Sequence, residues 1–313
     1  MTTGLIDSVA GYLGYTQDEV LALGRRAPVT YRHYKIPKKK HGFRTIHHPS
    51  KQTKALQYAL IEIFLSRLPI HKCAVAYRRG LRAPLRLNAT IHAKYRYSVK
   101  VDFSDFFHHI SPEDLLSQVQ LNQIELSPEE VTFVSNCLFV RLAGGRMGLA
   151  IGAPSSPIVS NIVMYSIDEA TTSLAGTISD QAAYTRYADD IIFSTDLRHA
   201  CQTFYKALNR LVSETRTPRL VINEEKTVFA SRASRRVVTG LFLRPDAGIS
   251  LGRENKRYIR KLLFDLSRGC LGPELQGYLS GYLAFALDVE PDFYNRLALK
   301  YGAELLDRAL NRA

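Results

Sequence analysis

Several features that mark particular classes of protein are scarce or missing in this sequence of 313 residues. The four cysteines (Cys73, Cys137, Cys201 and Cys270) lie far apart, so no pair has the spacing of a zinc or redox motif. We therefore expect reduced core residues of an intracellular protein. No apolar run approaches the roughly 20 residues that span a membrane. The N-terminus lacks a basic region followed by an apolar core, so we expect no signal peptide and a cytoplasmic location.

The balance of charge is strongly one-sided. Lysine and arginine number 42 against 29 for aspartate and glutamate, which gives a formal net charge of +13. Such an excess is typical of proteins that bind polyanions. The total alone decides little, because many soluble proteins are basic. The length is sufficient for two or three subdomains that share a sizeable core.

Residues 184–194 are the most informative stretch, because two adjacent acids, Asp189 and Asp190, lie between two apolar, β-prone arms. Such arms predict a hairpin with the acids at or near its turn. Adjacent carboxylates repel each other, so an apolar strand pair gains nothing structural from them. A divalent cation removes the conflict, since hard oxygen ligands suit Mg²⁺. For an isolated Asp-Asp pair, a solvated turn is the simpler interpretation.

A third acid favours the metal-binding interpretation. Asp102 follows residues 97–101, where apolar side chains alternate with polar or basic ones in the period of a strand. Two acidic strand ends side by side would form a carboxylate cluster able to hold two metal ions. Two metals roughly 3.5–4 Å apart stabilise the attacking and leaving oxygens of an in-line phosphoryl displacement. The sequence therefore predicts two Mg²⁺ ions held by Asp102, Asp189 and Asp190.

Positive charge is densest in residues 25–48. Gly42 within this segment suggests a turn between two strands, and hence a basic hairpin. A solvated charge run is the alternative interpretation, and three lysines alone would favour it.

Several helices are predicted from start signals and apolar spacing. Residues 54–68 have the pattern of a mostly buried helix. Ser111 and Ser127 are each followed by proline and, three positions on, by an acid, which is the chemistry of a helix N-cap. These two helices are expected to end near Val119 and Val140.

The C-terminal half contains further helix signals. Ser156 at the N-cap and Pro157 after it predict a helix through Asp168. Residues 253–269 predict an amphipathic helix with a cationic face, for which a solvated surface helix is the alternative. We expect two more helices from Pro273 onward.

The order of these features resembles the palm of a reverse transcriptase. Asp102 comes first, a Gly-Ala-Pro-Ser-Ser-Pro turn at residues 152–157 second, Tyr-Ala-Asp-Asp at residues 187–190 third and Lys226 fourth. The resemblance implies an α+β fold in the form of a right hand. Its antiparallel palm sheet would be backed by helices, and its thumb would be helical.

The resemblance also implies a division into subdomains. The fingers would comprise residues 1–95, including the N-terminal helices. The palm would comprise residues 96–240, with residues 118–150 returning to the fingers, and the thumb residues 241–313.

The family's nucleotide-binding positions have counterparts in this chain. The basic hairpin would meet the incoming triphosphate, with Arg44 as the first candidate and Lys39 as the second, because phosphate charge requires fixed cations. Phe107 would lie under the sugar, where a bulky ring can clash with a 2′-hydroxyl. Gly152 permits close approach of the backbone. Lys226 has two open interpretations: contact with the pyrophosphate leaving group, or an ion pair with one of the two preceding glutamates.

Two shorter motifs resemble those of retron reverse transcriptases: Asn88 with His92, and the Val-Thr-Gly sequence at residues 238–240. The chain departs from the family at Ile151, where glutamine is usual, so the contribution of that amide must be absent or supplied elsewhere. The residues expected to bind nucleic acid are Asn88, His92, Tyr187, Thr239, Gly240, Arg253, Lys256, Arg257 and Arg260.

The retron resemblance implies a specific reaction. The enzyme would copy part of a cognate structured non-coding RNA (msr-msd type) from dNTPs, with priming from a 2′-hydroxyl within that RNA. The branched RNA–DNA product (msDNA) would act with a separate effector protein in antiphage defence. The alternatives are an intron-type reverse transcriptase, an RNA-dependent RNA polymerase or a non-catalytic RNA-binding protein with a polymerase shape.

Overall fold

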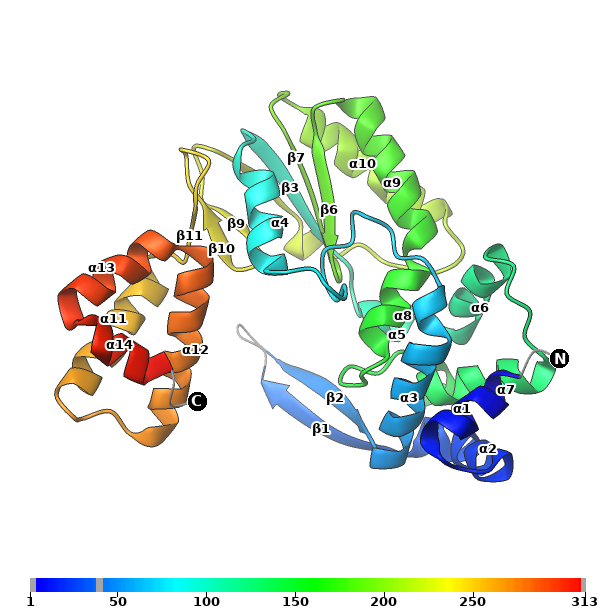
Figure 1. Ribbon diagram of the computed structural model, residues 1–313. Coiled ribbons are helices and arrows are strands. Elements are labelled where there is room, and N and C mark those ends of the chain that lie inside the picture. Colours follow the sequence, from blue (N-terminus) through cyan, green and yellow to red (C-terminus); the bar gives the residue numbers. More distant parts are fainter. Residues whose placement is uncertain (1–3, 38–41, 311–313) are drawn as a thin grey trace.

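The structure, a computed structural model, describes residues 4–37 and 42–310 (Figure 1). Lys39, a candidate for triphosphate binding, lies outside the described residues. Two short α-helices, a hairpin, a longer α-helix and two 3-10 helices make up the N-terminal part. These elements are α1 (Leu5–Leu13), α2 (Gln17–Arg26), η1 (Ala27–Val29), β1 (Tyr31–Pro37), β2 (Phe43–Pro49), α3 (Lys51–Ile63) and η2 (Leu65–Arg67).

The basic hairpin is confirmed. β1 and β2 pair antiparallel, from Tyr31 opposite Pro49 to Pro37 opposite Phe43. Gly42 directly precedes β2 with a φ of +81°, a backbone conformation that glycine adopts without steric cost.

A four-stranded antiparallel sheet lies at the centre, in the strand order β6-β7-β3-β8. Its strands are β3 (Tyr97–Asp102), β6 (Ala183–Tyr187), β7 (Asp190–Thr195) and β8 (Val228–Ser231). Side chains of β7 alternate between two cores, as the period of a strand requires. Ile191 and Phe193 belong to the core that contains Phe204 of α10 (Ala200–Glu214), whereas Ile192 belongs to the core that contains Ala89 of α4 (Pro84–Ala93). The sheet is therefore covered by helices on both faces (Figure 1).

The segment between β3 and β6 is mainly helical. It comprises α5 (Phe106–His109), α6 (Pro112–Leu121), α7 (Pro128–Leu138), β4 (Val140–Arg141), η3 (Ala143–Gly145), β5 (Met147–Gly148), α8 (Ser156–Val163) and α9 (Tyr165–Ile178). The predicted starts of α6 and α7 are confirmed. Ser111 and Ser127 both close capping boxes, in which the serine hydroxyl accepts a backbone N–H three residues on.

The helix predicted to run through Asp168 is two helices, which corrects that prediction. α8 ends at Val163, and α9 continues well past Asp168 to Ile178. Ser156 is the first helical residue, and Ser155 takes the N-cap position. Within α9, the hydroxyls of Thr171 and Thr172 donate to the carbonyls four residues earlier, so both polar side chains are satisfied inside the helix.

A small sheet and a helical bundle form the C-terminal part. The sheet has the order β11-β10-β9, and the elements are β9 (Arg236–Val238), β10 (Leu241–Leu243), β11 (Ile249–Ser250), α11 (Arg253–Ser267), α12 (Pro273–Val289), α13 (Pro291–Tyr301) and α14 (Ala303–Leu310). Between Pro273 and residue 310, where the described part of the chain ends, there are three helices and not the expected two. Pro291 at the first turn starts α13, and Gly302 with a φ of +88° ends it.

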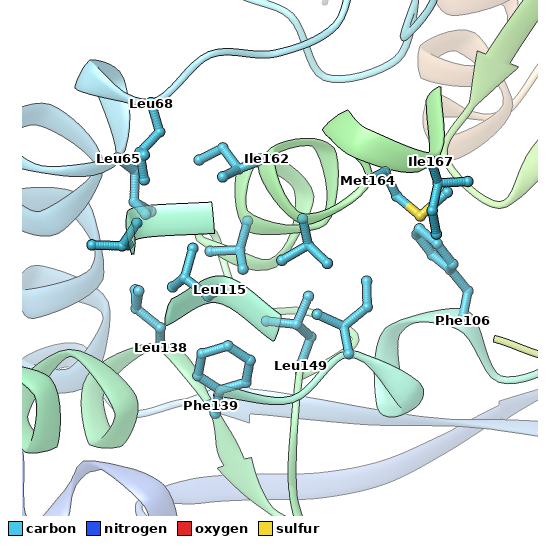
Figure 2. Packing of buried hydrophobic residues seen from close by; sticks show 14 of the residues in the cluster. Leu65, Leu68, Phe106, Leu115, Leu138, Phe139, Leu149, Ile162, Met164 and Ile167 are labelled. Atoms are coloured by element: carbon cyan, nitrogen blue, oxygen red, sulfur yellow. The ribbon is translucent and has the colours of Figure 1, made fainter. Parts of the chain in front are cut away.

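Most buried apolar residues fall into two clusters. The larger one joins α1–α3 and α6–α10 to the central sheet, and Figure 2 shows part of it, where Leu115, Leu138 and Ile162 of three different helices pack together. The smaller one joins β9–β11 and α11–α14 to α4. Among residues 4–37 and 42–310, no helix is both long and apolar enough to cross a membrane.

Arg186 of β6 and Asp168 of α9 form a fully buried ion pair. Nε and Nη2 of the guanidinium donate to the two carboxylate oxygens of Asp168 at 2.8 and 2.7 Å, and both side chains are 0% exposed. Nη1 donates to Asn161 Oδ1 and to the carbonyl of Ala188, each at 3.1 Å. The burial of both charges is compatible with stability because the pair is bidentate and further hydrogen-bonded.

Arg186→Met should lower the free energy of unfolding by about 3–5 kcal/mol, because it leaves the carboxylate of Asp168 buried without a cation. Urea denaturation followed by circular dichroism measures this loss. Arg210→Met is the control, since the pair of Arg210 with Glu214 has side chains 80% and 64% exposed and should contribute about 0.5 kcal/mol or less. Equal losses in the two variants would contradict the assignment.

Candidate functional site

The central sheet brings the three predicted acids together. Asp102 is the last residue of β3, Asp190 is the first of β7, and the two stand opposite each other in the antiparallel register. Asp189 lies in the turn between β6 and β7, after Ala188, whose φ is +57°. The predicted strand, hairpin and turn are confirmed. Like charges directly opposite each other destabilise a strand pair, so this arrangement requires added positive charge.

Two lysines supply positive charge at the acids. Lys226 Nζ donates to Asp102 Oδ1 at 2.7 Å, and Lys100 Nζ lies 2.7 Å from Asp190 Oδ2. Lys226 thus pairs with a candidate catalytic acid rather than with a preceding glutamate, which corrects that interpretation. Its contact with a pyrophosphate stays a prediction.

The pKa values reflect crowded carboxylates. Burial, together with the charges of Asp190 and Asp102, raises the pKa of Asp189 to about 6. Burial also raises the pKa of Asp190, and the nearby Lys100 ammonium opposes that rise. Ionising both Asp189 and Asp190 is therefore costly without additional cations. An all-oxygen donor set with excess negative charge fits Mg²⁺, so these three residues are the ones that would hold it.

A cavity of about 380 Å³ brings together three residues predicted to bind the nucleotide: Arg44 of β2, Phe107 of α5 and Gly152. They come from segments far apart in the sequence. Gly152 has a φ of +113°, and a Cβ there would lie 2.9 Å from Ile46 Cγ2 and 3.3 Å from the carbonyl of His47. Only glycine therefore permits β2 and the loop to approach this closely.

Ile151 lines the same cavity, and its carbonyl accepts a hydrogen bond from the backbone N–H of His47 at 2.8 Å. Its side chain offers no polar group to a ligand. Polar lining comes in part from Lys54, Tyr58 and Tyr77, which the sequence analysis did not single out. No local periodicity identifies them, because it is the fold that brings them to this cavity.

Tyr77 lies near both the basic hairpin and the acids. Partial burial raises the pKa of its phenol, and the charges of Tyr187 and Asp189 add to the rise while Arg44 opposes it. The rings of Tyr77 and Tyr187 are 6.4 Å apart between centroids, at an angle of 44°. The cavity and the turn that carries Asp189 are therefore neighbouring parts of one candidate site.

Asn88 and His92 are each 0% exposed, which corrects the prediction that they contact nucleic acid. The two ring nitrogens of His92 hydrogen-bond with Ser194 Oγ at 2.9 Å and Thr185 Oγ1 at 2.7 Å, and Thr185 donates to Asn88 Oδ1 at 2.6 Å. Burial lowers the pKa of His92 to about 3, which keeps the ring neutral near pH 7. The motif fastens α4 to β6 and β7.

The second retron-like motif forms a turn. Thr239 and Gly240 connect β9 to β10 with φ values of +48° and +83°. Thr239 Oγ1 donates to the carbonyl of Leu85 at 3.0 Å, which ties the turn to α4. Gly240 is exposed and Tyr187 is half-buried. Contact of Thr239, Gly240 and Tyr187 with nucleic acid stays a prediction.

Only part of the cationic face of α11 is available to bind phosphates. Arg253, Arg257 and Arg260 are exposed. Lys256 Nζ, in contrast, lies 2.5 Å from Glu290 Oε1 and its side chain is 19% exposed, so its charge joins α11 to the α12–α13 junction. The three arginines are the stronger candidates for phosphate contacts.

A second cluster has potential metal ligands, since ligand atoms of His71, Cys73 and Asp168 lie within 4.8 Å of one another. It is a poor metal site. The carboxylate of Asp168 is already paired with Arg186, and burial raises the pKa of the Cys73 thiol, which keeps it protonated.

Known proteins with similar sequences are reverse transcriptases. The family model described as reverse transcriptase (RNA-dependent DNA polymerase) matches residues 36–258. Retron Ec83 reverse transcriptase of Escherichia coli is 36% identical over 291 residues, which cover 92% of this chain and 92% of that protein. Retron Ec73 reverse transcriptase of Escherichia coli is also 36% identical over 291 residues, with 90% of each chain covered.

A solved structure of telomerase from Candida tropicalis with a fragment of telomeric RNA matches 91% of this chain with a TM-score of 0.52 and 12% identity. The chain spans about three fifths of that telomerase chain, for which the covered share is 59%. At this identity the likeness concerns the fold alone. Together with the family match, it confirms the predicted α+β right-hand polymerase fold.

Asp189→Asn should stabilise the protein at pH 8 in the presence of EDTA. The pKa of Asp189 is about 6 in the folded chain and 3.8 ordinarily, so the folded state binds the proton more tightly. The stability that this proton contributes is present at low pH and is lost as the pH rises through 6. The ionised acid therefore costs up to about 3 kcal/mol, which Asn removes.

Thermal melts at pH 5 and pH 8 measure this effect. The melting temperature of Asp189→Asn should exceed that of the wild type by a few degrees at pH 8, and by less at pH 5. Asp180→Asn, at an exposed acid, is the control and should change little. A lower melting temperature for Asp189→Asn at pH 8 would contradict the pKa assignment.

Proposed function

Because the chain belongs to the retron reverse transcriptases and is an RNA-directed DNA polymerase, we propose that it copies part of a cognate structured non-coding RNA into a short single-stranded DNA. Synthesis starts from a 2′-hydroxyl within that RNA and gives branched RNA–DNA, the msDNA of the retron. An effector protein completes an antiphage system with it. Similarity to two retron enzymes along nine tenths of the chain supports this proposal.

The observation that carries the proposal is the cluster of Asp102, Asp189 and Asp190 beside the cavity lined by Arg44 and Phe107. An acid cluster supplies ligands for divalent cations, and the cavity offers a guanidinium to phosphates and an aromatic wall to a sugar. A protein that only binds RNA has no need of clustered, partly buried acids such as Asp189 and Asp190, whose pKa values are raised.

The chain's own residues have defined parts in the reaction. Asp102, Asp189 and Asp190 would hold two Mg²⁺ ions, and the bound ions would supply a lower pKa for the primer hydroxyl and positive charge for the phosphates. Lys226 and Lys100 hold the carboxylates of Asp102 and Asp190 in place. Arg44, exposed on β2, offers paired N–H donors to the triphosphate. Phe107 narrows the cavity at the sugar and so favours dNTPs over NTPs.

We further propose the division into fingers (residues 1–95), palm (residues 96–240) and thumb (residues 241–313). The separate apolar cluster of β9–β11 and α11–α14 supports an independent thumb. α4, within the expected fingers, packs on that cluster and on β6. It therefore serves as a bridge between palm and thumb.

Asp189→Asn and Asp190→Asn should each lower dNTP incorporation on an RNA template by about 10³-fold or more, because each removes a charged ligand from the metal cluster. RNA affinity should stay within about threefold of the wild type, because affinity for RNA depends mainly on cationic side chains that bind phosphates, and neither substitution removes one. Primer extension and filter binding on the same RNA measure the two quantities.

Asp180→Asn again serves as the control, because it removes an exposed acid that precedes β6, whereas the clustered acids Asp189 and Asp190 follow that strand at its other end. Lost synthesis with retained RNA binding supports the enzyme. Synthesis at the wild-type rate in either variant would refute the site assignment, and RNA binding without synthesis in the wild type would favour a binding protein.

The retron part of the proposal has its own test. Nucleic acid that co-purifies with the protein from its native host should contain a short DNA whose end stays joined to RNA until a debranching enzyme is added. RNA alone, or DNA with a free 5′ end, would contradict 2′-hydroxyl priming while leaving the polymerase in place.

A further inference from the structure

We propose that Tyr77 is a specificity-determining residue of this polymerase, whose ring packs against the nascent base pair formed by the incoming nucleotide and its template partner. The inference rests on the proposed function and extends it to a residue outside the sequence motifs. It follows from where Tyr77 lies, how its backbone is held and what its ring offers.

The position of Tyr77 suits contact with a nucleotide. It lines the cavity that also contains Arg44, Phe107 and Gly152, yet the residue is 47% exposed. Its ring lies beside that of Tyr187, two residues before Asp189. Tyr77 thus lies between Arg44, a candidate phosphate ligand, and the turn that carries Asp189. About half of the residue's surface is exposed, so a bound nucleotide could pack against the ring.

The segment that carries Tyr77 is fixed to the catalytic hairpin. Val75 N–H donates to the carbonyl of Arg186 at 2.9 Å, in a parallel bridge that adds residues 73–75 to the edge strand β6. The next carbonyl, that of Ala76, accepts a hydrogen bond at 2.8 Å from Asn161 Nδ2, a side chain that is 0% exposed. Tyr77 therefore keeps its place relative to the catalytic turn.

The backbone of Tyr77 is strained. Its φ is +58°, in the left-handed region that residues with bulky side chains rarely adopt. Glycine or asparagine would adopt this conformation at lower cost. Such strain persists where the surrounding structure imposes it, and it is concentrated at functional sites. A large ring at a position that favours Gly or Asn therefore points to a function for the ring.

The chemistry of the ring points to a base rather than to a phosphate. A tyrosine ring presents a flat, apolar face, and stacking on it tolerates all four bases because each has a π-face. The guanidinium of Arg44 in the same cavity already suits the phosphates. Ile151, on the cavity wall, offers no group that would orient a base by hydrogen bonding. The ring of Tyr77 thus provides the flat apolar surface against which the base pair packs.

Two variants of the full-length protein test the proposal. Tyr77→Asn removes the ring and suits the left-handed backbone, whereas Tyr77→Phe keeps the ring and removes only the hydroxyl. Steady-state incorporation of each dNTP on a defined RNA template gives KM and kcat. We expect the KM of Tyr77→Asn to rise roughly tenfold for all four dNTPs, with misincorporation also raised, and that of Tyr77→Phe to stay within about twofold.

Thermal stability separates a functional role from a structural one. Because Asn relieves backbone strain, the melting temperature of Tyr77→Asn should equal or exceed that of the wild type. Gln123→Asn is the control. Gln123 is exposed, lies outside the cavity and has a φ of +56°, so asparagine relieves its backbone in the same way, and KM should stay unchanged.

Two results would overturn the proposal: an unchanged KM in Tyr77→Asn, or a fall in kcat that accompanies a lower melting temperature. Failure of the proposed function has a different signature, since the wild type itself would then incorporate no dNTP on any RNA template. An active wild type with an unaffected Tyr77→Asn variant would remove Tyr77 from the site and leave the polymerase intact.

Discussion

The mutual repulsion of three carboxylates, held together by a sheet, is the constraint on which the rest of the site depends. Asp102 and Asp190 are paired across two strands, and Asp189 is presented by the turn that follows β6. The fold offsets this repulsion with Lys226 and Lys100 and leaves the pKa of Asp189 raised to about 6. A cluster so placed costs stability where no cation offsets its charge, and its oxygen donors are of the kind that suits divalent cations.

The buried guanidinium of Arg186 makes that compromise possible. It binds Asp168 of α9, Asn161 of α8 and the carbonyl of Ala188, which lies in the turn that also carries Asp189. Asn161 in turn holds the carbonyl next to Tyr77. One network therefore fixes the turn that carries the acids and the segment that lines the nucleotide cavity. The two parts of the site keep their spacing because the same buried cation orders both.

Features with a local cause were predictable from the sequence, and features with a tertiary cause were not. The cap at Ser111 depends on its own neighbours, and the strand before Asp102 on alternating side chains, so both were confirmed. Contacts between residues far apart in the sequence have no local sequence pattern that predicts them. The family resemblance of the motif suggested that His92 binds nucleic acid, but the fold buries His92 on α4. Lys226 pairs with Asp102, an acid 124 residues away in the sequence. Tyr77 carries no sequence signal, because its strain and its neighbours exist only in the folded chain.

The most direct test of the account is the dependence of RNA-templated dNTP incorporation on free Mg²⁺. The carboxylate cluster predicts no incorporation above background in EDTA, recovery when Mg²⁺ is restored, and a rate that rises with more than the first power of the Mg²⁺ concentration before it saturates. Incorporation at an unchanged rate in EDTA would contradict the assignment of Asp102, Asp189 and Asp190 as the catalytic centre.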